Sequence, residues 1–591
     1  KPLTEREPAM NTHLYIVSNR IPFSFSKSFL QAAQEAIRNG GTPPNPSFGQ
    51  GGLVKAMRGL LKGDQWTTTW VGASMGDQDI EVTRGHYRTL FQQMEASGHT
   101  PDLFPFIKID PDNRMHFRFQ EYEFYMRFVF FDTHHMQSYY SKFANGFLWP
   151  LLHLTRPELF YKTSRIFPRP EFEKSDFVQY TSSGVTFANT VVDEILKQSQ
   201  KQREQDTIIW NQDYHLMRIA EVYRPLLREA GAHKQSQNRL HVGHFMHTPF
   251  FNIHEIQKLI REDKRSRLQS HVNDLYGETM ETVLQKLTWG MLSNDFIGFH
   301  TKEYCDNYLE ALQEWFPVQI RVNGQHYEIR RPYDVTTVGA IPIGLDVDNI
   351  LAQVSPERPL TFDYNGEDLY ERIQRDRDQG KWIVGGLERC DYTKGLLQRL
   401  NIFKQMQTEL GAENGKLCFY QVTAPSRSGN PDYQKLQRVL ADKVKGTNDV
   451  LGGEYVIHMD QGIAAPENYR FMREMDLMMV TPLEDGLNLV AFEYILSQKY
   501  KAPEKRGLLV LSQSGASRIL KERGFGEEDG VVHVNALRPK EAAKKAVAVL
   551  NKEGCISDRL IQYVEQERRV DDWARQNMDA IVHCKKGIEE L

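Results

Sequence analysis

Strand-like apolar runs alternate with helical patterns along most of this 591-residue chain, and this alternation restricts the fold more than any other feature. In the first half, apolar runs such as LYIVSN and LHVGHFM are separated by amphipathic stretches. The second half repeats the pattern with runs such as KWIVGGL and DLMMV. A βαβα order predicts parallel sheets with helices on both faces. We therefore expect an α/β fold with doubly wound sheets, in which ligands bind at the carboxyl ends of the strands.

The chain is too long for one hydrophobic core, so two or more domains are expected. A break at IPIGLDVDN precedes the polar, proline-containing stretch SPERPLTFDYNGED. We place the domain boundary there, which gives a first domain over 1–345, a second over 346–569 and an amphipathic final helix over 570–591.

Three segments of the first domain depart from the alternating pattern and are interpreted as insertions. Residues 22–48 are predicted to form a long loop, and residues 75–135 end in an aromatic, strand-like run. Residues 319–338 contain an Asn-Gly pair between alternating runs, which predicts a β-hairpin.

Composition excludes several classes of protein. A net charge of −4 gives no reason to expect binding to nucleic acid or to an anionic membrane. The five cysteines lack CxxC spacing and are odd in number, which argues against a disulfide framework and a zinc site and favours the cytoplasm. No run of 18 apolar residues is present, and the first residues lack an apolar signal segment, so neither a membrane span nor a signal peptide is expected.

The stretch TPLEDGLNLVAFEY, residues 481–494, predicts a turn that joins a buried strand to a helix beginning near Asn488. Such a junction directs the free N–H groups of the helix start toward anions or sugar oxygens. Asp485 is a candidate acceptor of sugar hydroxyls, and Glu493 is a candidate for contact with a ribose. The alternative interpretation is an acidic loop that only caps a helix.

Two further turns are candidates for phosphate binding. Arg389 and Lys394 lie five residues apart on a predicted turn after the strand WIVG, and two fixed cations suit a diphosphate. Gly51 and Gly52 precede a predicted helix and would allow close approach of the backbone to a phosphate or sugar. Solvated surface cations and ordinary loop glycines are the competing interpretations.

Polar and aromatic side chains at other strand ends are candidates for sugar contacts. Asp213 and His247 follow predicted strands, and the HxxH spacing of His244 and His247 also suits a metal, although no carboxylate or cysteine cluster accompanies it. Arg20 and Arg427, one in each domain, suggest an anionic acceptor, because guanidinium binds phosphate through parallel hydrogen bonds. Tyr140 and Trp149 could add a hydroxyl and a stacking face, or could be core aromatics.

Taken in order, these segments resemble glycosyltransferase family 20, the trehalose-6-phosphate synthase-like retaining glycosyltransferases. The resemblance spans residues 14 to about 515 and is carried by SNR, GGL, WxxDYHL, HxPF, GFHT, IPIG, ERxDYxKG, APSR, TPLxDGxNLVAxEY and LLVLSQ. It implies a GT-B fold, in which two Rossmann-like domains face each other across a cleft and the last helix packs back on the first domain.

The resemblance also implies roles for individual residues. The donor, a nucleotide-diphosphate sugar, would be bound by Gly51, Gly52, His247, Arg389, Lys394, Arg473, Asp485, Gly486, Asn488, Leu489, Val490 and Glu493. The phosphorylated acceptor would be bound by Arg20, Tyr140, Trp149, Asp213 and Arg427. The residues closest to catalysis would be Arg389, Lys394, Asp213, His247 and Asp485.

The implied reaction moves glucose to glucose 6-phosphate and yields trehalose 6-phosphate, a precursor of a compatible solute. The leaving diphosphate would help to deprotonate the incoming hydroxyl, so no cofactor, metal or protein nucleophile is expected. A homo-oligomer is possible, and a separate phosphatase is expected, because the last 100 residues lack a DxDx[TV] signature.

Departures from the family pattern keep other interpretations open. The loop between Arg20 and Gly52 is long, and Gly515, Ala516 and Ser517 replace the usual Phe-Ala-Gly. Alternatives are a glucosylglycerol-phosphate synthase with a glycerol 3-phosphate acceptor, a pseudo-glycosyltransferase and a non-catalytic regulatory subunit. Uridine, guanosine and adenosine donors all remain compatible with the sequence.

Overall fold

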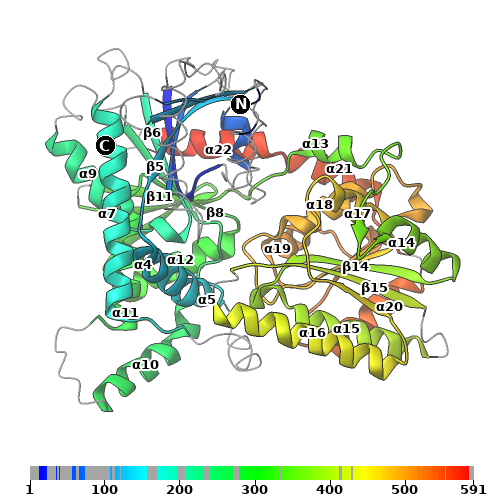
Figure 1. Ribbon diagram of the computed structural model, residues 1–591. Coiled ribbons are helices and arrows are strands. Elements are labelled where there is room, and N and C mark those ends of the chain that lie inside the picture. Colours follow the sequence, from blue (N-terminus) through cyan, green and yellow to red (C-terminus); the bar gives the residue numbers. More distant parts are fainter. Residues whose placement is uncertain are drawn as a thin grey trace. The chain divides into compact units, whose positions relative to one another are not determined.

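The structure, a computed structural model, describes residues 12–22, 35, 39, 56–61, 66–73, 107–109, 114–119, 122–155, 170–197, 206–230, 240–269, 278–332, 334–411, 416–427, 430–552 and 554–584. The chain divides by its internal contacts into two compact units (Figure 1). Unit 1 comprises Lys1–Leu151, Pro170–Ile341 and Ala574–Leu591, and unit 2 comprises Leu152–Arg169 and Pro342–Trp573. Each unit is built around its own sheet.

The sheet of unit 1 has a parallel centre and antiparallel edges. Its strands, in sheet order, are β3 (Ile107–Ile109), β4 (Arg114–Phe119), β5 (Tyr122–Val129), β2 (Thr67–Ala73), β1 (Thr12–Arg20), β6 (Asp206–Gln212), β7 (Leu240–Phe245), β8 (Phe296–Phe299), β11 (Asp334–Ala340), β10 (His326–Arg331) and β9 (Gln319–Asn323). All neighbours from β5 to β11 are parallel, and each edge adds two strands in antiparallel pairing. The order reverses at β1, because β2 lies on one side of it and β6 on the other.

The two antiparallel edges fall in segments interpreted from the sequence as insertions. The β-hairpin predicted within 319–338 is confirmed as β9 and β10, and Gly324 in its turn has a φ of 61°. The aromatic run that ends the 75–135 segment forms β4 and β5. Most of 22–48 and residues 74–106 lie outside the described residues.

Helices of unit 1 connect and cover these strands. They are η1 (Arg58–Leu61), α4 (Thr133–Met136), the π-helix η3 (Gln137–Leu148), α5 (Trp149–Leu152), α7 (Lys174–Leu196), η4 (Tyr214–Leu216), α9 (Ile219–Glu229), α10 (Ile253–Gln269), α11 (Met280–Gly290), η5 (Met291–Ser293) and α12 (Lys302–Trp315). The last helix, α22 (Val570–His583), belongs to unit 1 from Ala574 onward. Its Ile581 lies against Gly243 of β7, where a Cβ would come within 2.3 Å of the Ile581 side chain.

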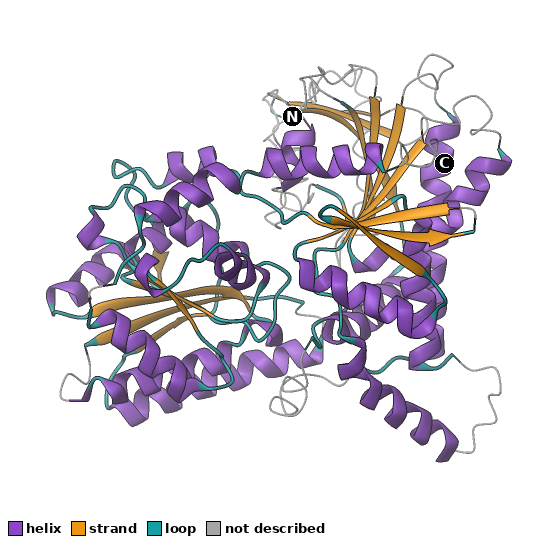
Figure 2. Ribbon diagram, turned by 180° about the vertical axis from the view of Figure 1, so that it is seen from behind, coloured by secondary structure: helices purple, strands orange, loops and turns teal. Residues whose placement is uncertain are grey.

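Unit 2 has a six-stranded, fully parallel sheet with helices on both faces (Figures 1 and 2). Its strands, in sheet order, are β16 (Val456–Met459), β15 (Leu417–Ala424), β14 (Trp382–Arg389), β17 (Leu477–Val480), β18 (Leu508–Leu511) and β19 (Val531–His533). All six were predicted from the sequence. The order reverses between β14 and β17, and this is the position at which ligands bind in such sheets.

The helices of unit 2 form two layers. Figure 1 shows α15, α16 and α20 on one face of the sheet and α17, α18 and α19 on the other. The helices are α13 (Val347–Gln353), α14 (Leu369–Asp378), η6 (Tyr392–Lys394), α15 (Leu396–Glu409), α16 (Pro431–Leu451), α17 (Glu467–Glu474), α18 (Leu489–Ser497), η8 (Pro503–Lys505), α19 (Gly515–Glu522), η9 (Glu527–Asp529), α20 (Pro539–Leu550) and α21 (Asp558–Glu567). A small hairpin, β12 (Asp363–Tyr364) and β13 (Glu367–Asp368), precedes α14.

Among the described residues, no helix is both long enough and apolar enough to cross a membrane.

Candidate active site

Two turns of unit 2 pack backbone against backbone at the carboxyl ends of the neighbouring strands β14 and β17. The Leu483 N–H donates to the Thr393 carbonyl at 2.7 Å. Gly395 has a φ of 62°, and a Cβ there would lie 2.1 Å from the Thr481 carbonyl oxygen. Only glycine fits both the backbone conformation and this close approach. The packing brings the turn that carries Lys394 beside the turn that carries Asp485.

Lys394 is buried between two carboxylates. Its ammonium forms ion pairs with Asp485 and, at 3.4 Å, with Glu388. The amide of Asn488 donates to Glu388 at 2.8 Å and to Asp485 at 3.2 Å. Burial opposes the charge of Lys394, but Asp485 and Glu388 outweigh it and raise the pKa of the amine above its usual value. Lys394 is therefore a fixed, fully protonated cation at neutral pH.

Asn488 marks the start of helix α18 and has an unusual backbone conformation, with a φ of 66°. Leu489 and Val490 form the first turn of the helix, so their N–H groups lie at its positive end. Glu493 is buried one turn further along. This geometry suits an anion or a sugar beside the helix start.

The loop before α18 is supported from behind by α19. The Gly515 N–H donates to the Asp485 carbonyl at 3.1 Å, and the Ala516 N–H donates to the Leu487 carbonyl at 2.8 Å. A Cβ on Gly515 would lie 2.2 Å from the carbonyl oxygen of Gly486, so this position needs glycine. Gly515 and Ala516, two of the residues that depart from the family pattern, therefore pack closely behind the loop in this chain.

Arg427 lies just after β15, the other neighbour of β14, and its φ is 49°. Its guanidinium donates to Asp391 at 3.5 Å and to the hydroxyl of Tyr433. Arg389, at the end of β14, is exposed, and its guanidinium donates to Ser426 at 3.4 Å. Two adjacent strand ends thus carry the three cations: Arg389 and Lys394 follow β14, and Arg427 follows β15.

Arg473 is the one described residue of the predicted donor set in unit 2 that the structure places away from this group. It lies in α17, and its guanidinium donates to the carbonyls of Ser355 and Arg358 at 2.9 and 3.0 Å. These contacts anchor the segment that follows α13.

In unit 1, Arg20 at the end of β1 is exposed and donates to the Tyr140 hydroxyl at 2.6 Å. The ring of Tyr140 stacks on His215, with centroids 5.6 Å apart. Trp149 packs against Tyr214 at 5.7 Å. The predicted acceptor residues Arg20, Tyr140 and Trp149 are therefore joined through η4, the short helix that follows Asp213.

Tyr140 lies in the π-helix η3, and Trp149 caps the end of this helix as the first residue of α5, where its N–H donates to the Ala144 carbonyl. Asn145 ties this helix to η4, because its amide donates to the Tyr140 carbonyl and accepts from the Tyr214 hydroxyl, both at 2.8 Å. Such helices are rare and often mark functional sites.

Asp213 and His247 meet at the ends of β6 and β7. The His247 N–H donates to the Asp213 carboxylate at 3.2 Å, and its ring nitrogen Nε2 lies 2.9 Å from the Gln212 side-chain oxygen. An amide oxygen only accepts, so Nε2 carries the ring proton. Burial, with His244 nearby, lowers the pKa of His247 to about 3, so the ring is neutral at physiological pH. Asp213 has a φ of 69°.

Gly51 and Gly52 lie outside the described residues. Within the part of the chain that is described, no group of three or more His, Cys, Asp or Glu side chains is placed to hold a metal.

The profile of Glycosyltransferase family 20 matches residues 12–262 and 279–582. The chain belongs to this family.

Individual relatives agree with this assignment. The 56 kDa subunit of the UDP-forming alpha,alpha-trehalose-phosphate synthase of Saccharomyces cerevisiae is 28% identical over 515 residues, covering 86% of this chain and 82% of the relative. A UDP-forming trehalose-phosphate synthase from Burkholderia xenovorans, solved in complex with glucose-6-phosphate, has a TM-score of 0.66 at 20% identity, covering 96% of this chain and 99% of that one. An E. coli structure bound with UDP-2-fluoro glucose has the same TM-score and identity. The likeness confirms the predicted GT-B fold.

Three residues of this candidate site were not predicted from the sequence, although a signal was present for two of them. Glu388, Asp391 and Tyr433 are buried polar residues that hold the predicted cations in place. Glu388 and Asp391 lie within the ERxDYxKG motif, where a carboxylate beside each cation suggests internal pairing. Tyr433 lies in α16 and has no motif of its own.

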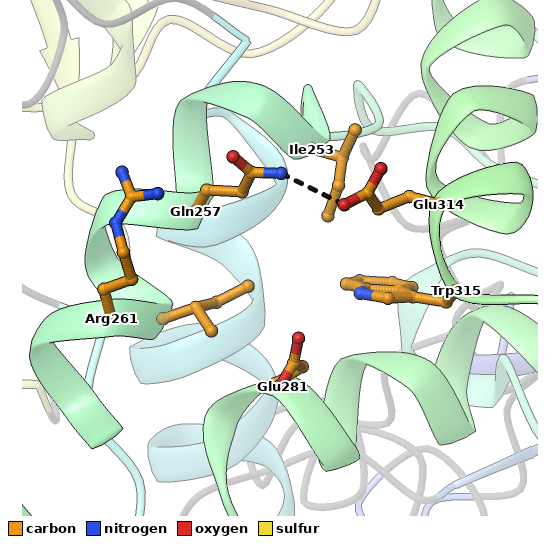
Figure 3. Close-up of a pocket in the computed structure, with 7 residues that line it drawn as sticks. Ile253, Gln257, Arg261, Glu281, Glu314 and Trp315 are labelled. Carbon is orange, nitrogen blue, oxygen red and sulfur yellow. Dashed lines mark hydrogen bonds between the residues drawn. The ribbon is translucent and has the colours of Figure 1, made fainter. Parts of the chain in front are cut away.

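A separate pocket of about 220 Å³ lies between α10, α11 and α12 of unit 1 (Figure 3). Gln257 donates across it to Glu314 at 3.3 Å, and Trp315 forms one wall. Arg261 and Glu281 lie at its rim (Figure 3). No predicted site residue lines this pocket.

Proposed function

We propose that this chain is a retaining glucosyltransferase that moves glucose from UDP-glucose to glucose 6-phosphate and forms trehalose 6-phosphate. The observation that carries the proposal is the group of three cations at adjacent strand ends of unit 2, with Lys394 held beside the start of α18. Membership of family 20 and relatives named as UDP-forming trehalose-phosphate synthases support the choice of substrates.

Donor binding is assigned to unit 2. Lys394 and Arg389 would neutralise the diphosphate, and the N–H groups of Leu489 and Val490 would donate to its oxygens. Asp485, beside Lys394, would accept from the sugar hydroxyls, and Glu493 would accept from the ribose. Gly51, Gly52 and His247, the other members of the predicted donor set, belong to unit 1.

Acceptor binding is assigned to Arg20, Tyr140, Trp149, Asp213 and Arg427. Arg20 and the Tyr140 hydroxyl already form a hydrogen-bonded pair, which presents two donors to a phosphate. Asp213 accepts from a backbone N–H and offers a carboxylate to sugar hydroxyls. This set suits a sugar phosphate better than a neutral sugar, because it contains two guanidinium groups.

Catalysis would depend on orientation and charge. Lys394 and Arg389 stabilise the negative charge that develops on the departing diphosphate, and the proton of the incoming hydroxyl passes to an oxygen of that leaving group. His247 is neutral and would act as a hydrogen-bonding group to the donor sugar. We propose that these cations make a metal unnecessary, so that turnover persists in excess EDTA.

The test is a matrix of UDP-, GDP- and ADP-glucose against glucose 6-phosphate and glycerol 3-phosphate, scored by the mass of the product. We expect a disaccharide phosphate with UDP-glucose and glucose 6-phosphate, formed about 100-fold or more slowly by the Lys394→Ala variant. A product only with glycerol 3-phosphate would replace the proposed acceptor, and no product with any pair would refute the activity.

Two further proposals concern partners. A separate phosphatase would remove the phosphate from trehalose 6-phosphate, and the chain would act in the cytoplasm as a homo-oligomer. Inorganic phosphate release by the purified protein would contradict the first proposal, and a monomeric mass by light scattering would contradict an oligomer.

A further inference from the structure

Asp391 is a buried carboxylate whose two oxygens serve different parts of the candidate site. Its side chain is fully inaccessible to solvent. One oxygen, Oδ1, accepts from the Thr393 N–H at 3.0 Å and from the Thr393 hydroxyl at 2.9 Å. The other oxygen, Oδ2, accepts from the Arg427 guanidinium at 3.5 Å and from the Tyr433 hydroxyl at 3.3 Å.

The Oδ1 contacts define the turn that carries Lys394. Asp391 caps η6, the short helix formed by residues Tyr392–Lys394, and its carbonyl accepts from the Lys394 N–H at 3.1 Å. Asp391 holds the beginning of this turn. Its end is held by the close approach of Gly395 to the Thr481 carbonyl and by the hydrogen bond from the Leu483 N–H to the Thr393 carbonyl. Lys394 is held in place by this closed turn.

The Oδ2 contacts define the direction of Arg427. The guanidinium donates through one nitrogen, Nη1, to both Asp391 and Tyr433. The Tyr433 hydroxyl accepts from Arg427 and donates to Asp391, so the three groups form a closed triangle. Burial opposes the charge of Asp391, but Arg427, Arg389 and the Thr393 N–H lower the pKa of its carboxyl below the usual value.

We propose that Asp391 is a positioning residue shared by the two substrates, with Oδ1 orienting Lys394 for the donor diphosphate and Oδ2 orienting Arg427 for the acceptor phosphate. The inference deepens the proposed function and rests on it. Because the two oxygens act separately, changes on one side should weaken one substrate more than the other. A carboxylate that only stabilised the fold would weaken both substrates together.

The decisive variant is Asp391→Asn, which keeps the shape but replaces one oxygen with an NH₂ donor. The contacts of Oδ1 with Thr393, at 3.0 and 2.9 Å, are shorter than those of Oδ2 with Arg427 and Tyr433, at 3.5 and 3.3 Å, so the remaining oxygen should face Thr393 and the NH₂ group should face Arg427. We expect the KM for glucose 6-phosphate to rise about tenfold or more, as for a lost hydrogen bond to a charged group, with the KM for UDP-glucose within about threefold. Tyr433→Phe should likewise raise the KM for glucose 6-phosphate more than the KM for UDP-glucose. Thr393→Val should have the opposite preference and raise mainly the KM for UDP-glucose. Asp391→Ala should raise both Michaelis constants.

Matched controls come from Asp376 of α14 and Tyr420 of β15, which form a similar carboxylate–hydroxyl contact outside the candidate site. Asp376 accepts from the Tyr420 hydroxyl at 2.5 Å and from Lys381 at 2.7 Å, as Asp391 does from its own partners. Asp376→Asn and Tyr420→Phe should lower thermal stability without separating the two Michaelis constants. Calorimetric titration with UDP and with glucose 6-phosphate compares the two affinities without turnover. If Asp391→Ala fails to fold, Asp391→Asn and Tyr433→Phe still test the inference.

The outcomes separate this inference from the proposed function. If Asp391→Asn and Tyr433→Phe change both affinities equally, or neither, the shared positioning role is wrong. If Arg427→Ala leaves glucose 6-phosphate affinity unchanged and Lys394→Ala leaves UDP affinity unchanged, the assignment of the substrates to this site is wrong. The inference is supported if Asp391→Asn, Tyr433→Phe and Arg427→Ala each weaken the affinity for glucose 6-phosphate and leave the affinity for UDP unchanged.

Discussion

At the scale of single residues, backbone strain coincides with the candidate site. Among the described non-glycine residues, four have a positive φ, and three of them are predicted site residues: Asp213, Arg427 and Asn488. Such conformations cost about 1–3 kcal/mol each and persist where the surroundings fix them. Each of the three follows a strand and makes a polar side-chain contact within its unit. Strain at these positions is therefore consistent with side chains held ready for a ligand.

Replacing either donor-side cation should impair chemistry more than folding. We expect Lys394→Ala and Arg389→Ala each to lower kcat by about 100-fold or more, since each removes a charge that stabilises the transition state. Steady-state kinetics with UDP-glucose and glucose 6-phosphate measures the effect, and Lys540→Ala, an exposed lysine of α20, is the control. Near-normal turnover in both cation variants would refute the diphosphate assignment.

At the scale of elements, the sequence predicts strands better than it predicts how side chains are presented. The parallel strands of unit 2 and most of those of unit 1 were predicted, because short runs rich in β-branched residues are typical of buried strands. The exception is β11, which was interpreted as part of the 319–338 insertion. The π-helix η3 was not predicted, because its extra residue per turn is stabilised by packing of Asn145 against Tyr214 rather than by a local pattern. The positions of Lys394 and Asp485 were expected, but the contact of their turns depends on Gly395 and could not be read from spacing.

The π-helix leads to a prediction at this scale. Asn145 touches neither proposed substrate but joins the Tyr140 carbonyl to the Tyr214 hydroxyl. Asn145→Ala should destabilise the protein by about 1–3 kcal/mol, because it leaves buried polar groups unpaired. It should also raise the KM for glucose 6-phosphate and leave that for UDP-glucose unchanged.

Urea unfolding and steady-state kinetics measure the two effects of Asn145→Ala. Gln562→Ala, on the exposed face of α21, is the control and should change neither quantity. A variant with lower stability but an unaltered acceptor KM would show that η3 is only structural.

At the scale of the whole molecule, neither unit is one continuous stretch of chain. Residues Leu152–Arg169 belong to unit 2 although they are flanked by unit 1, and Thr155 there donates to the buried carboxylate of Glu484 at 2.6 Å. Glu484 also pairs with Arg518 at 2.7 Å. Because Glu484 directly precedes Asp485, Thr155 contacts the loop that carries Asp485. No change in composition along the sequence indicates that residues 152–169 belong to unit 2, because the contact with unit 2 is made by single buried side chains. A residue flanked in the sequence by unit 1 therefore contacts the loop of unit 2 that carries Asp485.

Buried histidines make the stability of the molecule depend on pH. Burial lowers the pKa of His244 to about 3, and burial together with Arg114 lowers that of His13 to about 3. The unfolded chain binds a proton at each of these residues below about pH 6.5, whereas the folded chain does not. Stability should therefore fall as the pH falls from 7, by about 2 kcal/mol for each residue at pH 5.

Urea unfolding at pH 5, 6 and 7 measures this slope. His244→Gln should reduce it, the exposed control His254→Gln should not, and equal slopes in all three proteins would contradict the prediction.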